Sequence, residues 1–345
     1  MYKKIIATIL ALAMMLSLVS CSSNSSSTVA TTDANTETGD AVKKPDNWPK
    51  KTITIIVPHA SGGATDLLAR ALASDMSEIL GVSVIVDCKA GGGGAVGMAQ
   101  AAAAAADGYT LAMGAMGAHS IAPMTLGAAY SYEDFAQICT LTETPFAISV
   151  NKDSKFNTLE EMLAYAKDHP GELTYGTAGA GSAYHVWFAS FLLKHFGDAN
   201  LMTHVAYGGG AEAVTSLLGG HVDCAVSSSA EHAPYITSGD FKGLAITSEK
   251  RVEELPDTPS IGEAGYPDDA AGTWFAISAP AKTDAAIVSY LETVIMGIMK
   301  TDKMIEICKN LNQPIVLRDG KTFYELWKNA WENNKATLQA LGLYK

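Results

Sequence analysis

Basic residues are scarce in this chain. Its 345 residues contain 24 Lys and Arg against 36 Asp and Glu, which gives a formal net charge of −12 at pH 7. An acidic surface repels phosphate backbones, so the charge argues against nucleic-acid binding. It does not exclude small anions as ligands, because a local site on an acidic protein can be electropositive. Hydrophobic residues make up 48% of the chain, which is enough for a core and excludes wholesale disorder.

Cysteine is also scarce, and its spacing carries no metal motif. Besides Cys21, the chain has Cys88, Cys139, Cys224 and Cys308, each more than fifty residues from the next. Neither a CxxC pair nor a Cys/His ligand spacing occurs, so we expect no metal site. Isolated buried thiols are the expected state of these four side chains, with disulfides between them as the alternative outside the cytoplasm.

Motifs of common enzymes are missing as well. The sequence has no GxSxG elbow, no HExxH and no GxxxxGK[ST] phosphate loop. Gly92, Gly94 and Gly97 fit the dinucleotide spacing GxGxxG, but with four glycines in six residues the match is nearly automatic. No acidic residue follows about twenty positions beyond Gly97 to hold a ribose hydroxyl. We therefore predict that the protein is not an enzyme and needs no cofactor, with a nicotinamide-dependent enzyme as an alternative.

Beyond the N-terminus, no apolar run is long enough to span a membrane. The N-terminus itself has two lysines, Lys3 and Lys4, before the apolar stretch 5–19, which is the pattern of a secretory signal. The sequence Leu-Val-Ser-Cys at 18–21 resembles a bacterial lipobox. Residues 1–20 are therefore predicted to be a lipoprotein signal peptide, and Cys21 the lipidated first residue of the mature chain.

The segment 21–47 is predicted to be a flexible linker. Residues 22–40 contain ten Ser or Thr and no Lys or Arg, so they cannot bury enough apolar surface to offset the entropy lost on ordering. The protein is thus expected to be extracytoplasmic and lipid-anchored to the bacterial cell membrane.

Strand and helix patterns alternate along the rest of the chain. Residues 51–58 form a β-branched run typical of a buried strand, and an amphipathic helix pattern follows over 67–80. Strand 82–86, helix 96–106 and strand 109–113 continue the series. This order predicts right-handed βαβ units of a parallel α/β sheet.

The same alternation recurs further along the chain. Predicted strands are 147–150, 174–175, 204–206, 223–227, 243–247 and 274–278, and predicted helices are 158–167, 183–196, 211–218, 284–300 and 320–341. Two α/β units predict a two-domain, periplasmic-binding-protein-like flytrap with a ligand cleft between the domains. Domain 1 is predicted to be discontinuous, 48–148 plus 272–345, and domain 2 to cover 149–271. Hinges are expected near 148–150 and 270–273.

Four glycine-rich loops precede predicted helices, at 60–66, 91–95, 178–185 and 207–211. Each can present backbone N–H groups at a helix N-terminus, where the helix dipole favours an anion. Four to six charge-assisted hydrogen bonds of about 1.5–3 kcal/mol each would suffice for micromolar affinity. Any single loop is equally well explained as a tight turn or a helix-packing site. Together the four loops favour one anion site.

Ordered motifs across 48–345 resemble the tripartite tricarboxylate transporter receptors, the Bug family. They include V-P-H-A-S-G-G-A-T-D-L-L-A-R over 57–70, D-G-Y-T-L over 107–111, Y-G-T at 175–177, G-S at 181–182 and L-P-D-T-P over 255–259. The resemblance implies a receptor whose two α/β domains close on a small carboxylate. It also implies delivery of that carboxylate to a permease of one large and one small membrane subunit.

The resemblance also nominates ligand-binding residues. In that family the loops that match 60–66 and 178–185 grip the carboxylate through backbone amides, hydroxyls and ordered water. The ligand-binding residues predicted here, including a rim from the other loops, are His59, Ser61, Gly62, Gly63, Thr65, Asp66, Gly117, His119, Thr177, Ala180, Gly181, Ser182, Tyr207, Gly208, Ser227 and Ser228. Asp66 is expected to shape and cap its loop, since a carboxylate repels the ligand's own.

Some positions depart from the family pattern. His59 stands where an aromatic residue is usual, and it can donate to a distal acid group or titrate. Cys88 stands where asparagine is expected, and Ala206 and Gly208 replace a proline and a lysine. The fold expectation is unaffected, but mono-, di- and tricarboxylic acids all remain open as ligands. We expect a monomer, and the alternative function is a ligand-presenting sensory protein for a membrane receptor kinase.

Overall fold

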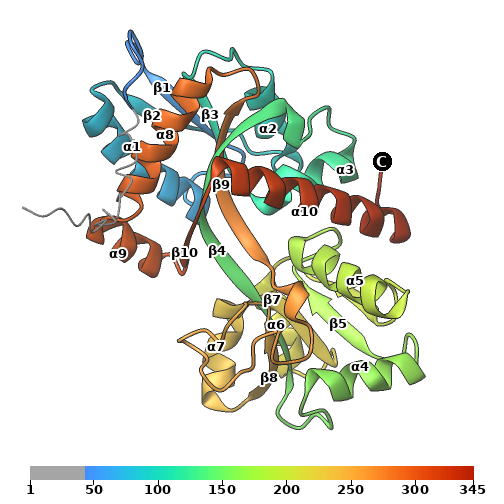
Figure 1. Ribbon diagram of the computed structural model, residues 1–345. Coiled ribbons are helices and arrows are strands. Elements are labelled where there is room, and N and C mark those ends of the chain that lie inside the picture. The colour runs from blue at the N-terminus through green and yellow to red at the C-terminus, as the bar shows by residue number, and fades with distance from the viewer. Residues whose placement is uncertain (1–42) are drawn as a thin grey trace, which may run out of the picture. The chain divides into compact units, whose positions relative to one another are not determined.

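Residues 43–345 are described by the computed structural model (Figure 1). The predicted signal peptide, the lipidation site Cys21 and the predicted linker as far as residue 42 lie outside the described residues. The described chain is built on a ten-stranded mixed sheet with strand order β2-β1-β3-β9-β4-β7-β5-β6, to which β8 and β10 add by pairing with β4. None of its helices is both long and apolar enough to cross a membrane.

The N-terminal part of the sheet is parallel, as predicted. Strand β1 lies between β2 and β3 and pairs in parallel with both. The loops that follow these strands therefore meet at one edge of the sheet. The elements of this part are β1 (Ile53–Val57), α1 (Ala64–Leu80), β2 (Val84–Cys88), η1 (Gly92–Gly94), α2 (Ala95–Ala102), β3 (Thr110–Ala115), η2 (Gly117–Ile121), α3 (Ala122–Leu126) and η3 (Tyr132–Asp134).

Two long strands join the N-terminal part to the rest. Strand β4 (Phe135–Asn151) pairs antiparallel with β9 (Gly272–Pro280) as far as Pro145, and with β7 and β8 beyond it (Figure 1). The sheet is thus mixed rather than parallel. The sequence predicted only 147–150 of β4, because buried polar residues interrupt its apolar pattern. Thr140, for example, is fully buried and donates to the carbonyl of Val316 at 2.8 Å.

The middle of the chain repeats the parallel arrangement. Strand β5 lies between β6 and β7 and is parallel to both, while β8 is antiparallel to β4. The elements here are α4 (Leu159–Asp168), β5 (Thr174–Thr177), α5 (Ala183–Phe196), β6 (Thr203–Ala206), α6 (Gly210–Leu218), β7 (Cys224–Ser228), α7 (Ser229–Ser238), β8 (Phe241–Ile246) and η4 (Pro267–Asp269). Helix α7 was not predicted; it contains Pro234, which ordinarily argues against a helix.

The C-terminal elements return to the N-terminal part. They are α8 (Ala285–Ile298), α9 (Asp302–Asn310), β10 (Ile315–Asp319) and α10 (Gly320–Ala340). Strand β10 pairs with β4, and α10 packs on β4 and on α5. The sequence analysis missed α9 and β10 but placed α8 and α10 within two residues of their observed ends.

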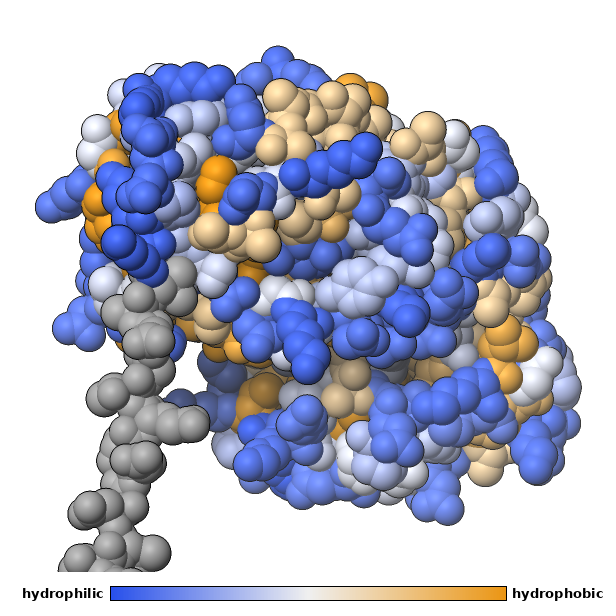
Figure 2. All heavy atoms as spheres, turned by 45° about the horizontal axis from the view of Figure 1, so that its top comes forward, coloured by the Kyte–Doolittle hydropathy of each residue, from blue (hydrophilic) through white to orange (hydrophobic). Residues whose placement is uncertain are grey.

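The buried side chains divide into two sets. Two clusters draw on residues 48–141 and 274–338 with one addition, Val186. The other three draw on residues 146–261. The division falls close to the change of partner along β4, whereas the domain bounds themselves stay a prediction. Cys139, Cys224 and Cys308 are buried free thiols, and Cys88 is a half-buried one. Hydrophilic side chains predominate on the face seen in Figure 2.

Candidate ligand-binding site

The loop between β1 and α1 is organised by a buried carboxylate. Asp66 Oδ2 accepts a hydrogen bond from the amide of Gly62 at 2.8 Å and one from Ser61 Oγ at 3.1 Å. Its Oδ1 accepts from Cys88 Sγ at 3.1 Å and pairs with Arg70 Nε at 2.9 Å. All of these contacts lie within the loop and its neighbours, so Asp66 shapes the loop as the sequence analysis expected.

These contacts decide the charge of Asp66. Burial alone would raise the pKa of its carboxyl, but the Gly62 amide, Arg70, Cys88 and Ser61 together hold that pKa well below its usual range. The carboxylate is therefore ionised at every physiological pH. Arg70 pairs with it through Nε while remaining 51% exposed, so its charge is partly neutralised beside the loop.

The N-terminus of α1 has amides to offer. Its N-cap is Gly63, which has no side chain to satisfy the first turn. Within residues 43–345, the N–H groups of Gly63, Ala64 and Thr65 have no hydrogen-bond acceptor. Such a terminus suits a carboxylate, since free N–H groups and the helix dipole act together.

Two predicted histidines lie behind this loop. His119 is fully buried, donates through Nδ1 to the carbonyl of Ala115 at 2.9 Å, and packs its ring 4.5 Å from Trp327 and 4.9 Å from Trp274, centroid to centroid. Burial lowers the pKa of His119 to about 4 and also lowers that of His59. Both are neutral at pH 7. The side chain of His119 does not reach the surface, whereas His59 is only half-buried.

The glycines between β2 and α2 have a packing role. A Cβ on Gly94 would overlap that of Ala118, and a Cβ on Gly97 would lie 2.8 Å from Pro58 Cα and 2.9 Å from the carbonyl oxygen of Lys89. Glycine is therefore required for α2 to approach the β1 loop and η2. This accounts for the GxGxxG spacing without a dinucleotide. It also places the loops 58–63, 91–94 and 117–121 next to one another.

The loop between β5 and α5 is organised by histidines. Thr177 Oγ1 lies 2.7 Å from His204 Nε2, and the amide of Gly181 donates to His185 Nδ1 at 3.0 Å. The rings of His185 and His204 stack with centroids 3.7 Å apart. Ser182 caps α5 by accepting from the amide of His185 at 3.3 Å. Ser182 and His185 thus form a helix cap rather than a nucleophile and its base.

Both histidines are neutral in this arrangement. Burial lowers the pKa of His185 to about 4, with a further contribution from the neighbouring His204, and burial lowers the pKa of His204 to about 4 as well. His185 accepts from Gly181 through Nδ1 only in its unprotonated form. His204 was not among the predicted site residues; its position one strand away from Thr177 could be found only from the pairing of β5 with β6.

Most of the other predicted residues form hydrogen bonds to their own loop or to the helix that follows it. The hydroxyl of Tyr207 bonds Ser216, and the amide of Gly208 donates to Glu212 at 2.8 Å. Ser227 is fully buried and lies 3.0 Å from His232 Nε2, so its hydroxyl does not face a ligand. The amide of Ser228 donates to Glu231 at 3.1 Å. Within the described residues, Gly210 and Ala211 at the uncapped start of α6 keep free amides.

The loops 58–63, 91–94 and 117–121 form one group and the loops 177–182 and 207–211 form another. The two groups approach each other at α3. A Cβ on Gly181 would lie 3.8 Å from Thr125 Cγ2 of α3, and a Cβ on Gly179 would lie 3.3 Å from the carbonyl oxygen of Tyr207. Leu126, next to Thr125, touches the position of a Cβ on Gly92. Loops 177–182 and 207–211 are therefore linked through α3 to the loops of the N-terminal part. No cluster of three or more potential metal ligands occurs in residues 43–345.

A cavity is lined by residues of both parts of the chain that the sequence analysis predicted as domains. It has a volume of about 1010 Å³ and is lined by β4, β9, α5 and α10, with none of the predicted ligand-binding residues among its walls. Its residues are scattered over the sequence from 116 to 337, so no local motif marks it.

Comparison with known proteins gives consistent results. Residues 68–343 match the family described as the tripartite tricarboxylate transporter family receptor. Protein BugT of Bordetella pertussis is 33% identical over 264 residues, which is 76% of this chain and 80% of BugT.

Solved structures agree on the fold. A TctC solute-binding protein from Polaromonas, determined without ligand, superposes with a TM-score of 0.76 at 30% identity, covering 85% of this chain and 99% of that one. MatC from Rhodopseudomonas palustris with bound malate has a TM-score of 0.63 at 28% identity, covering 84% and 100%. The predicted α/β fold of the periplasmic solute-binding type is confirmed.

Proposed function

Because the chain belongs to the tripartite tricarboxylate transporter receptor family, which are periplasmic solute-binding receptors and not enzymes, we propose that it captures a small carboxylate for transport. The carboxylate would pass to a membrane permease of one large and one small subunit. The observation that carries this proposal is the pair of uncapped helix N-termini, on α1 and α6, in loops that are otherwise tied down by their own side chains.

The chemistry of the loops suits a carboxylate. Free amides remain on Gly63, Ala64 and Thr65 of one group, and on Gly179, Ala180, Gly210 and Ala211 of the other, within residues 43–345. Four to six of these bonds, at about 1.5–3 kcal/mol each, would give at least micromolar affinity after the costs of binding. No lysine or arginine is needed, and the only arginine beside the first loop is already paired.

A dicarboxylate is the ligand class that we favour. MatC, a relative at 28% identity, carries malate. In this chain His59 is half-buried and neutral, so part of its ring is accessible beside the first loop. A second polar group of the ligand would bind this accessible part of the ring, while the first carboxylate binds the amides.

Closure and anchoring complete the proposal. The two parts joined by β4 and β9 would act as domains, 48–148 with 272–345 and 149–271, that close on the ligand. Cys21 would carry the lipid, and the Ser/Thr-rich linker would keep the receptor near the permease. Ser61, Ser182 and Gly117 would contribute to the rim of the closed site.

The amide of Ala64 offers a direct test. Ala64 is the first residue of α1, where proline is well tolerated, and the preceding Gly63 has the extended backbone that a following proline requires. Ala64→Pro therefore removes one N–H while leaving the helix intact. We expect the affinity for malate, or for the tightest binder among malate, adipate and citrate, to fall by about 10- to 150-fold, since one charge-assisted bond is lost.

Ala285→Pro is the matched control, because Ala285 is the exposed first residue of α8, a helix remote from these loops. Both variants should unfold at the same temperature as the parent chain. Titration calorimetry on the chain from Ser22 onward measures the affinities. Equal carboxylate affinity in the two variants, or no binding of any carboxylate to the parent, would contradict the proposed function.

A further inference from the structure

The cavity of about 1010 Å³ is a groove with a mixed lining. Residues from β4 and β9 form its floor, α5 and α10 form its walls, and the segments 247–254 and 268–272 form its rim. It contains none of the residues assigned to the carboxylate above. Its composition therefore calls for a separate explanation.

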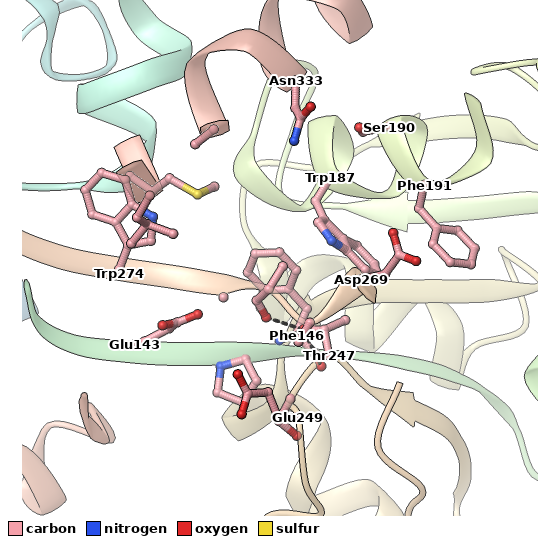
Figure 3. A pocket seen from close by; sticks show the side chains of 18 of the residues that line it. Glu143, Phe146, Trp187, Ser190, Phe191, Thr247, Glu249, Asp269, Trp274 and Asn333 are labelled. Carbon is pink, nitrogen blue, oxygen red and sulfur yellow. Dashed lines mark hydrogen bonds between the residues drawn. The ribbon is translucent and has the colours of Figure 1, made fainter. Parts of the chain in front are cut away.

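Aromatic side chains line the groove from its β4 and β9 floor and from its α5 wall. Trp187 of α5 is partly exposed and packs 5.6 Å from Phe146 and 5.7 Å from Phe191, centroid to centroid. Figure 3 shows these rings and Trp274 around the same space, with the carboxylates of Glu143, Glu249 and Asp269 beside them. Phe146, Phe191 and Trp274 are at most 2% exposed, so the partly exposed ring of Trp187 is the aromatic surface that an apolar anchor of a protein partner can contact.

The rim of the groove is acidic. Six carboxylates line the groove, those of Glu143, Glu249, Glu253, Glu254, Asp268 and Asp269. Of residues 43–345, two cations line the groove as well, and each is paired: Lys194 with Asp269 at 2.8 Å and Arg318 with Glu143.

The other four acids remain unpaired. Glu249, Glu253, Glu254 and Asp268 are exposed and form no ion pair within residues 43–345. Unpaired charges of one sign around an apolar floor favour an occupant of the opposite charge.

The wall of α10 sets the length of that occupant. Leu326, Asn329, Ala330, Asn333 and Thr337 recur at helical spacing and face the groove together. From Leu326 to Thr337 the helix rises about 16 Å, at about 1.5 Å per residue. An extended chain covers that distance in about five residues, at about 3.3 Å each. The groove is thus longer than a small organic cation.

We propose that this groove binds a basic polypeptide segment with an aromatic or aliphatic anchor, supplied by a partner protein. The partner's lysines or arginines pair with the four free acids, and its anchor lies against Trp187. The chain's own N-terminal segment is a poor occupant, because residues 22–42 contain Asp33, Glu37 and Asp40 but no Lys or Arg.

The test uses labelled octapeptides and the chain from Ser22 onward. Four probes alternate Lys or Arg with Leu or Trp, and a fifth replaces every cation by Glu. Fluorescence anisotropy should show saturable binding of at least one basic probe, weakening as salt rises, and no binding of the acidic probe. Spermidine, which has charge but no anchor, should compete poorly.

Matched variants locate the site. Glu249→Gln/Glu253→Gln/Glu254→Gln should weaken the basic probe about tenfold or more. The control Glu78→Gln/Glu160→Gln/Glu306→Gln removes three exposed acids that do not line the groove and should change the affinity less than about twofold. Asn333→Trp, which fills the groove from an exposed position, should abolish binding. All variants should keep the parent's unfolding temperature.

Three results would overturn the proposal. One is the absence of saturable binding of every basic probe to the parent chain. Another is an equal loss in the two triple variants, which would mean that net charge alone attracts the peptide. The third is binding of spermidine as tight as that of the peptides, which would identify a polyamine site instead.

Discussion

The loop before α1 and the loop before α5 occupy matching places in two βαβ units, yet they are held by opposite chemistry. In the first, the ionised carboxylate of Asp66 accepts bonds from an amide, a hydroxyl, a thiol and a guanidinium. In the second, the neutral rings of His185 and His204 hold Gly181 and Thr177. Both devices leave backbone amides for the ligand, but they respond differently to protonation.

Because of that difference, we expect the two loops to change protonation state at different pH. The pKa of Asp66 is held so low that its loop keeps the same charge state across the physiological range. The pKa values of His185 and His204 lie near 4, so their loop changes state in mildly acidic solution. As pH falls, we therefore expect the loop before α5 to lose its contacts to the carboxylate ligand before the loop before α1 does.

The largest effect is expected at Asp66. Asp66→Asn replaces a buried carboxylate by an amide that can accept at only one atom, which leaves Arg70 and the Gly62 amide poorly paired. We expect the free energy of unfolding to fall by about 2–4 kcal/mol, as measured by urea denaturation. Carboxylate affinity should fall with it.

Asp107→Asn provides the comparison for Asp66→Asn. Asp107 also accepts from a backbone amide and pairs with a cation, Lys51, but it is 43% exposed. Its replacement should cost less than about 1 kcal/mol. A similar cost at both positions would mean that Asp66 does not organise its loop.

The next effect depends on pH. Since the folded pKa of His185 is about 4 and the ordinary value is 6.5, the unfolded chain takes up the proton first as pH falls. The contribution of neutral His185 to the free energy of unfolding is fully present above about pH 6.5, and it is lost as the pH falls from 6.5 to 4. The loss approaches about 1.4 kcal/mol per pH unit for one histidine. Urea denaturation of the parent at pH 7, 6 and 5 measures it.

His185→Gln isolates the contribution of this residue from those of His119 and His232. Glutamine can accept from the Gly181 amide and does not titrate in this range. The variant should lose less stability and less carboxylate affinity than the parent between pH 7 and 5. His221→Gln, at an exposed histidine, should follow the parent curve. If stability and carboxylate affinity of His185→Gln fall with pH as they do in the parent, protonation of His185 does not make the loop before α5 more sensitive to pH than the loop before α1.

The sequence could predict the loops but not what fixes them. Glycines before helices and the order of strands indicated where amides would be free, and Asp66 was correctly assigned to shaping its loop. His204, by contrast, reaches Thr177 only because β5 pairs with β6 in parallel. Tyr207, Gly208 and Ser228 proved to bond their own helices, which depends on side-chain geometry that spacing does not encode.

The same limit applies to the fold. Alternating patterns identified most helices and the parallel strands, because those elements bury one clear apolar face. The long strand β4 was seen only at its end, since Thr140, Thr142 and Thr144 are buried on it with polar partners. From the sequence alone, a buried threonine with a hydrogen-bond partner cannot be told from a threonine exposed to solvent. The residues that line the groove could not be predicted for a related reason, because only packing brings its walls together.

The smallest expected effect concerns Cys88, where the family pattern has asparagine. Burial and the neighbouring Asp66 raise the pKa of the Cys88 thiol, so it stays protonated and donates to Asp66 Oδ1. Because a thiol is a weak donor, Cys88→Asn should stabilise the first loop by about 0.5 kcal/mol through a stronger N–H bond to the same oxygen. This gain in the free energy of unfolding must vanish when Asp66 is already replaced by Asn. A double-mutant cycle of the two substitutions, measured by urea denaturation, tests this. If the same gain persists there, asparagine acts through β2 rather than through the carboxylate, and the first loop owes less to Asp66 than its contacts indicate.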